Sequence, residues 1–194
     1  EIGSDEDGTF FRVRFPLFKE GLEAYGLLIQ PHTSHTVPGR HLAVGIHGGC
    51  GSPEVAAGVF ESYNYHDMGR QLVRRGHTGW MPACPEPYSK NNPEKSDETL
   101  DVHRALERKA RIVGSSLSAV DAYIILTSTK AIMESSYCTV EAAIAVGLSY
   151  GGYRSLLTTA LSDLFVACIS SCYFNNHRSV LEQYLESGDI SDWY

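Results

Sequence analysis

An apolar segment that runs through a glycine-rich turn into a helical pattern constrains this chain most. Residues 142–147 have the length and the small or branched side chains of a buried strand. Residues 153–161 follow with the apolar spacing of a helix, and the turn between them reads GLSYG. A strand that passes into a helix this quickly must bend sharply, and the glycines around the turn leave room for the bend. The segment therefore predicts a strand, a tight turn with Ser149 at its apex, and a helix.

Strands and helices alternate through the rest of the chain. The apolar patterns predict strands at residues 9–18, 22–30, 41–47, 77–83 and 164–172, and helices at 64–75, 102–113, 117–135 and 181–186. A turn at residues 19–21 joins the first two strands into a hairpin, and residues 31–39 and 84–97 read as loops.

This alternation predicts the α/β fold class, because helices that link strands imply crossovers in a mostly parallel sheet. We expect a mostly parallel central sheet with helices on both faces and an antiparallel N-terminal hairpin. The strands at 41–46 and 142–147 should lie at the centre. The strand at 164–172 should form an open, apolar edge that favours association of copies.

Length and composition limit the classes of function. With 194 residues, the chain fits one domain, which we place at 9–194 after a polar tail at 1–8. The net charge of −7 argues against a nucleic-acid partner, and no apolar run approaches the length of a membrane helix. No signal segment is visible, which favours a cytoplasmic location. The five cysteines include no CxxC pair, as expected for reduced thiols.

Ser149 is the first candidate for chemistry, because a nucleophilic serine must project from a tight strand-to-helix turn. That turn also aims the backbone N–H of Tyr150 at a reacting carbonyl group. The small neighbours that the bend requires are Gly147 and Gly151. The alternative interpretation is a glycine-rich turn that contains an incidental serine.

A second glycine-rich segment, HGGCG at residues 47–51, directly follows the strand at 41–46. Glycines at the end of a central strand leave backbone N–H groups that can stabilise an oxyanion. The loop begins with His47 and Gly48, and it could also be a plain connection between a strand and a helix. His47 itself fits a histidine that hydrogen-bonds local backbone better than a catalytic one.

The sequence resembles the α/β-hydrolase superfamily in three blocks: HLAVGIHGGCG, RGHTGWMPA and AVGLSYGGYRSLLTTALSDLFVACISSCYFN. The last block looks most like the branch that holds dienelactone hydrolases and acetyl-xylan-esterase-like proteins. The resemblance implies a serine hydrolase of small-molecule esters, of carboxylesterase or acetyl esterase type, with a Ser–acid–His triad and no cofactor. Ser149 would be the nucleophile and the Tyr150 N–H one oxyanion donor. The second donor would be the Gly49 N–H, with the Cys50 N–H as the alternative.

The triad is where the chain departs from the family pattern. The acid and the histidine follow the nucleophile in this fold, after strands that we expect to lie beyond Tyr194. We therefore interpret the chain as about the first two thirds of such a domain, without its last strands and nearly inactive alone. His177, the one histidine after Ser149, precedes the nearby aspartates, which is the wrong order. His32, His35 and His41 lack further ligands at metal-binding spacing, so we expect no metal site.

Two other functions stay open. The turn of prolyl-oligopeptidase-type serine peptidases also often reads Ser-Tyr-Gly-Gly, as residues 149–152 do here. A relative that keeps the turn but lacks the triad would be an inactive binding protein.

Overall fold

A computed structural model describes residues 1–17, 21, 23–32, 41–49, 51–61, 64–85, 96–136 and 138–187. For residues 96–101, 177, 184 and 187 it describes the backbone alone. The strands are β1 (Gly3–Ser4), β2 (Gly8–Pro16), β3 (Glu23–Pro31), β4 (Leu42–Ile46), β5 (Thr78–Pro82), β6 (Ala143–Leu148) and β7 (Phe165–Ser171). The helices are α1 (Pro53–Ala57), α2 (Met68–Arg74), α3 (Ser96–Ile112), α4 (Leu117–Met133), α5 (Tyr150–Leu161) and α6 (His177–Ser187).

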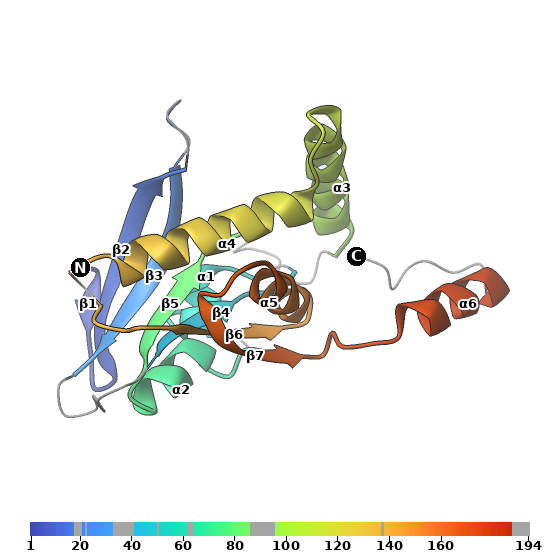
Figure 1. The fold of residues 1–194 in the computed structure, drawn as a ribbon. Helices are drawn as coiled ribbons and strands as arrows, with labels where there is room; N and C mark the ends of the chain where they lie inside the picture. Colours follow the sequence, from blue (N-terminus) through green and yellow to red (C-terminus); the bar gives the residue numbers. More distant parts are fainter. Residues whose placement is uncertain are drawn as a thin grey trace.

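The strands form one mixed sheet in the order β1-β2-β3-β5-β4-β6-β7 (Figure 1). β1, β2 and β3 pair antiparallel, and β3 also runs antiparallel to β5. From β5 through β4 and β6 to β7 the pairing is parallel. The predicted antiparallel hairpin and the central position of β4 and β6 are both confirmed. The parallel part brings the carboxyl ends of β5, β4 and β6 to one edge of the sheet.

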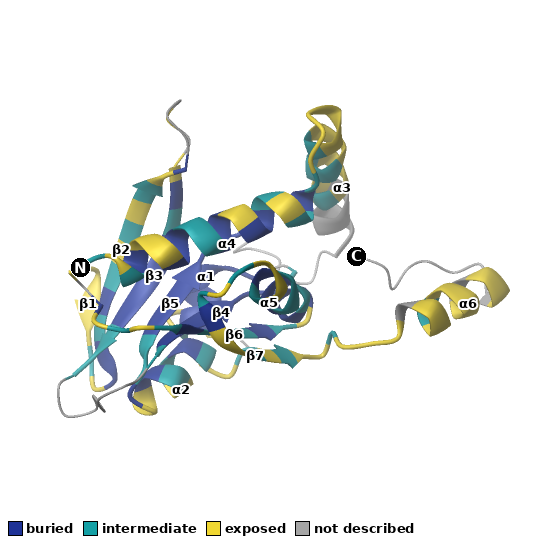
Figure 2. Ribbon diagram, viewed as in Figure 1, coloured by how far each residue is buried: buried dark blue, intermediate teal, exposed yellow. Residues whose placement is uncertain are grey.

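Helices cover both faces of β4, as predicted, whereas β6 is covered on the face toward α4 and α5 and keeps Ile144 and Val146 of its other face only half-buried. On one face, Ile125 and Ile132 of α4 pack in a cluster with Leu42, Val44 and Ile46 of β4. On the other, residues of α1 and α2 pack against Leu27, Ile29 and Met81. Figure 2 shows the resulting burial, with the central strands buried and α6 largely exposed. β4 is therefore enclosed along its whole length between two layers of helices.

The N-terminal residues correct one expectation, because they are part of the domain rather than a polar tail. Residues 3–4 form β1 on the outer side of β2. Asp7 is only 5% exposed and accepts hydrogen bonds from Arg70 and Arg74 of α2. Burial raises the pKa of Asp7, but the hydrogen bonds and charges of Arg74 and Arg70 outweigh it and hold that pKa below its usual range. Composition suggested a solvated segment because it cannot reveal these distant cationic partners.

Several helices differ from the sequence patterns: α3 begins at Ser96, inside the predicted loop, and α6 begins at His177, four residues before its predicted start. The five-residue helix α1 was not expected; its N-cap is Ser52, whose Oγ accepts from the Val55 N–H at 3.3 Å. Helix α5 begins at Tyr150, three residues earlier than its apolar pattern indicates. The apolar pattern misses this first turn because residues 151 and 152 are glycines, which carry no apolar side chain.

At the far side of the sheet, β7 is the edge of the described strands and is mostly exposed, including Val166 and Ile169. Beyond it, α6 stands away from the sheet (Figure 1). Among the described residues no single helix is long and apolar enough to cross a membrane. Only α3 and α4 taken together, bent by 88° where they meet, reach that length and composition.

Candidate active site

Ser149 occupies the turn between β6 and α5. It is the N-cap residue of α5, its side chain is exposed, and its backbone has φ 55° and ψ −126°. A serine with positive φ in this region is strained by about 1–3 kcal/mol. The turn is anchored to the neighbouring strand, because the Ser149 N–H donates to the Ser171 carbonyl at 2.8 Å. The hydroxyl is thus presented to solvent at the N-terminus of a helix.

The two glycines that flank Ser149 allow this turn to exist. A Cβ atom on Gly147 would collide with the Gly151 carbonyl, and one on Gly151 would collide with the carbonyl of Ile46 in β4. The first contact closes the turn on itself, and the second lets α5 start directly against the neighbouring strand. These contacts explain why the turn needs glycine at both positions.

The loop that follows β4 lies directly against this turn. A Cβ atom on Gly48 would lie 3.2 Å from the Ser149 Cβ and 3.3 Å from the Tyr150 nitrogen. The next residue, Gly49, has open space around it. The structure therefore brings Gly48 next to Ser149 and Tyr150, which follow it by about 100 residues in the chain, and Gly49 comes directly after it in an open position. Cys50, the alternative donor, lies outside the described residues.

His47 fixes this loop through both ring nitrogens. It is 1% exposed, and its Nε2 accepts a hydrogen bond from the Cys84 N–H at 3.1 Å. An accepting Nε2 places the ring proton on Nδ1, which donates to the Gly48 carbonyl at 3.0 Å. His47 thus connects the ends of β4 and β5. The structure agrees with the interpretation of His47 as a residue that hydrogen-bonds local backbone.

A buried ion pair between α5 and α4 supports the loop at residues 47–49. Arg154 of α5 and Asp121 of α4 are both fully buried, with 2.7 Å between Nε and Oδ2. Arg154 also donates from a terminal guanidinium nitrogen to the His47 carbonyl at 2.9 Å, and its guanidinium lies 4.5 Å from the centre of the Tyr150 ring. One side chain therefore ties the β4 loop, α4 and α5 together.

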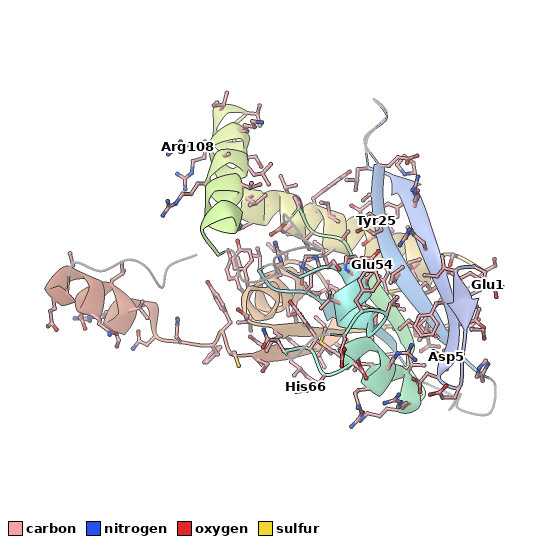
Figure 3. All side chains as sticks on the ribbon, turned by 180° about the vertical axis from the view of Figure 1, so that it is seen from behind. Glu1, Asp5, Tyr25, Glu54, His66 and Arg108 are labelled. Carbon is pink, nitrogen blue, oxygen red and sulfur yellow. The ribbon has the colours of Figure 1, made fainter. Side chains whose placement is uncertain are left out.

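Tyr65 is a residue of this site that sequence reasoning assigned only to a helical pattern. Its hydroxyl accepts the Gly48 N–H at 2.8 Å. Tyr65 lies shortly before α2. The two residues between them, His66 (labelled in Figure 3) and Asp67, have φ of 46° and 54°, both in the left-handed region. Because the Gly48 N–H is committed to Tyr65, it is not the donor aimed at a substrate. A tyrosine 17 residues after Gly48 carried no spacing signal that could have identified it.

The side chain of Tyr150 packs in an aromatic cluster. Its ring lies 5.3 Å from the rings of both His103 and Tyr153, and Tyr173 completes the group. Burial raises the pKa of Tyr150 to about 12, so its phenol stays protonated at neutral pH. The cluster fixes the first turn of α5, whose backbone carries the Tyr150 N–H.

No protein-family model matches the sequence, and a comparison with curated proteins finds no match. Solved structures do resemble it. A Bacteroides fragilis protein assigned as an acetyl xylan esterase superposes with a TM-score of 0.66 at 14% identity, over 82% of this chain and 43% of that one. For the acylaminoacyl peptidase of Pyrococcus horikoshii the TM-score is 0.51 at 23% identity, over 84% and 23%. For a cold-adapted esterase from an Arctic intertidal metagenomic library it is 0.55 at 15%, over 82% and 57%.

The chain has the α/β-hydrolase fold. It spans between 23% and 57% of the length of these three proteins. The superpositions establish the fold. At identities this low they do not establish the reaction, which has to be argued from the site. In this fold, the turn at Ser149 and residues 47–49 follow the neighbouring parallel strands β6 and β4 at their carboxyl ends.

The other histidines considered from the sequence lie elsewhere in this α/β-hydrolase fold. His177 is the first residue of α6, which stands away from the sheet (Figure 1). The Nε2 of His32 lies 2.6 Å from the Asp5 carbonyl oxygen, and the ring of His41 lies 6.3 Å from that of His77. His35 lies outside the described residues. In the part of the chain that the structure describes, no group of three or more His, Cys, Asp or Glu side chains is arranged to hold a metal ion.

Proposed function

We propose that this protein is a serine hydrolase that cleaves carboxylic esters through an acyl-enzyme on Ser149. The observation that carries the proposal is the exposed, strained Ser149 next to the Gly48–Gly49 loop and the N-terminus of α5. A strained residue is retained where the surrounding structure enforces it, and such residues cluster at active sites. The esterases among the similar folds support this reaction class.

In the proposed mechanism, the Ser149 Oγ attacks the ester carbonyl carbon and gives up its proton to a base. The carbonyl oxygen becomes an oxyanion that accepts hydrogen bonds from the N–H groups of Tyr150 and Gly49. Collapse of the tetrahedral intermediate expels the alcohol, which takes the proton from the base. Water then attacks the acyl-enzyme with the same base, which releases the carboxylic acid and restores Ser149.

We propose that the base and its acid partner follow Ser149 in the protein and that neither is His177, which begins α6 away from the sheet (Figure 1). In this fold they follow the nucleophile in the chain. His47 is unsuited to be the base, because its Nε2 and Nδ1 bond to Cys84 and Gly48. Without a base, oxyanion stabilisation and binding leave about 10³–10⁴-fold acceleration over water. We expect residues 1–194 alone to hydrolyse an activated acetate ester barely above background.

A serine peptidase is the second candidate, favoured by the superposition on an acylaminoacyl peptidase. It would use Ser149 and the same donors, and it differs in the leaving group. Comparing an acetate ester with an N-acetylaminoacyl anilide on the complete protein separates the two functions. An inactive binding protein would hydrolyse neither.

The decisive experiment is Ser149→Ala in the complete protein. We expect turnover of an activated acetate ester to fall by about 10⁴-fold or more, because the nucleophile is lost. Circular dichroism should be unchanged, because the exposed oxygen contributes nothing to the core. Ser162→Ala, at the other end of α5, is the matched control and should retain activity. Unchanged turnover in Ser149→Ala would contradict the proposal.

A further inference from the structure

A large apolar cavity lies at the same edge of the sheet as Ser149. Its volume is about 760 Å³, and its walls come from β3, the end of β5, α3 and α4. Apolar side chains dominate the walls: Leu17, Ala24, Ala83, Leu106, Val120 and Ile124. The charged member, Glu23, is exposed, so the deeper surface is hydrocarbon. Small-molecule sites have volumes of about 300–1,000 Å³ and predominantly apolar walls.

Two contacts link the walls of the cavity to the candidate active site. Cys84, which lines it, donates its backbone N–H to His47, the first residue of the Gly48–Gly49 loop. Leu106, also in its wall, lies one helical turn along α3 from His103, whose ring packs on Tyr150. Adjacent strands are about 4.8 Å apart, so the end of β5 lies about 10 Å from the turn at the end of β6. A hydrocarbon chain attached at Ser149 can span that distance.

The walls are held in place without a ligand. The Glu107 Oε2 of α3 accepts the Leu117 N–H at the start of α4 at 2.6 Å, which fixes the corner between the helices. That hydrogen bond, against the opposing effect of burial, keeps the pKa of Glu107 below its usual range, so the carboxylate is present at neutral pH. The Tyr123 hydroxyl donates to the Leu17 carbonyl at 3.1 Å and so joins α4 to the end of β2. Tyr25, which is labelled in Figure 3 and also lines the cavity, lies on β3, the other strand of the hairpin. A preformed apolar cavity binds hydrocarbon without a cost for ordering its walls.

We propose that this cavity binds an apolar hydrocarbon group of the ester, so that the substrate class is esters with a medium-length alkyl chain rather than acetate esters. The inference rests on the proposed function, because it assigns the cavity to the substrate of Ser149. Each methylene that the cavity removes from water strengthens binding about fourfold. The chain can belong to the acyl or to the alcohol side of the ester, and the two arms of the kinetic experiment distinguish these sources.

Binding is tested first without catalysis. Ser149→Ala protein is titrated with 2-decanone by calorimetry at several temperatures. We expect saturable binding with a negative heat-capacity change, the mark of apolar burial. Adding Ala119→Trp, which fills the cavity from an exposed position on α4, should weaken binding at least tenfold. Ala131→Trp, on the same helix and outside the cavity, should leave binding unchanged.

A second variant, Leu106→Glu, places a carboxylate in the wall and should weaken binding similarly, which keeps the test valid if Ala119→Trp fails to fold. The proposal is overturned if Ser149→Ala protein does not bind 2-decanone. It is also overturned if both cavity variants bind 2-decanone as tightly as the Ser149→Ala parent does.

The kinetic experiment varies one side of the ester at a time in the complete protein. One arm extends the acyl chain of p-nitrophenyl esters from acetate to octanoate, and the other extends the alcohol chain of acetate esters. In one arm kcat/KM should rise with each methylene, and Ala119→Trp should remove that rise. A flat response in both arms contradicts the proposal. If hydrolysis instead persists in Ser149→Ala, the proposed function fails, while the titration with 2-decanone still decides what the cavity binds.

Discussion

Two glycine-rich turns meet at one edge of the sheet, and they are stabilised in different ways. The turn at 147–151 is held by backbone contacts: its glycines close it, one hydrogen bond to β7 anchors it, and strain is concentrated at Ser149. The loop at 47–49 is held by groups from distant parts of the chain, namely Tyr65, Cys84 and Arg154. A nucleophile needs a fixed direction, which local sterics provide. A set of N–H donors needs a fixed position relative to that nucleophile, which only tertiary contacts provide.

The largest effect on this arrangement should come from Arg154→Met. The variant leaves the Asp121 carboxylate buried without its cationic partner, which typically costs about 3–5 kcal/mol of folding free energy. It also removes the hydrogen bond to the His47 carbonyl, so the loop at 47–49 should be destabilised more than the Ser149 turn. Urea unfolding monitored by circular dichroism measures the loss.

Arg178→Met is the control for that experiment, because Arg178 pairs with Glu182 on the exposed surface of α6. Exposed pairs contribute little, so no measurable change in stability is expected there. Equal stability of the Arg154 and Arg178 variants would show that the buried pair does not hold the loop.

Tyr65→Phe tests the loop without disturbing the core. The phenyl ring keeps its packing, but the Gly48 N–H loses its acceptor, which costs about 1–3 kcal/mol for a buried donor. Because the donor proposed at Gly49 would act on the oxyanion, kcat should fall about 10- to 100-fold while KM changes little. The assay is steady-state ester hydrolysis by the complete protein.

Tyr153→Phe is the control, because it also removes one tyrosine hydroxyl, which in this case donates a hydrogen bond to the Ser118 hydroxyl. It should leave kcat within a factor of about two to three, the usual scatter of such effects. A Tyr65 variant with an unchanged kcat, or with a change in KM alone, would show that the hydroxyl does not position the oxyanion donors.

The same contrast explains how much could be predicted from the sequence. The strand, turn and helix around Ser149 follow from contiguous residues, so their position and the central place of β4 and β6 were predictable. The loop's supports come from Tyr65, Arg154 and Asp121, which meet only in the folded chain. Asp7, in the segment taken for a polar tail, is buried for the same reason: its partners Arg70 and Arg74 lie more than 60 residues away. Periodicity finds elements, but it carries no signal for polar pairs between them.

The smallest effect, and the most specific for the Ser149 turn, should come from Ser149→Gly. Glycine adopts positive φ without the steric penalty that serine and alanine pay, so the strain at φ 55° should be released. The gain is reduced by the greater freedom of glycine in the unfolded chain, which leaves about 0.5–1.5 kcal/mol relative to Ser149→Ala. Both variants lack the proposed nucleophile, so stability alone separates them. Ser162→Gly against Ser162→Ala is the matched pair, because Ser162 has ordinary extended backbone, φ −156° and ψ 137°, where glycine should destabilise. Urea unfolding should therefore show opposite signs at the two ends of α5. If glycine changed the free energy of unfolding relative to alanine with the same sign at both positions, the turn would store no strain. Its conformation would then be fixed only by its glycines and by the hydrogen bond to β7.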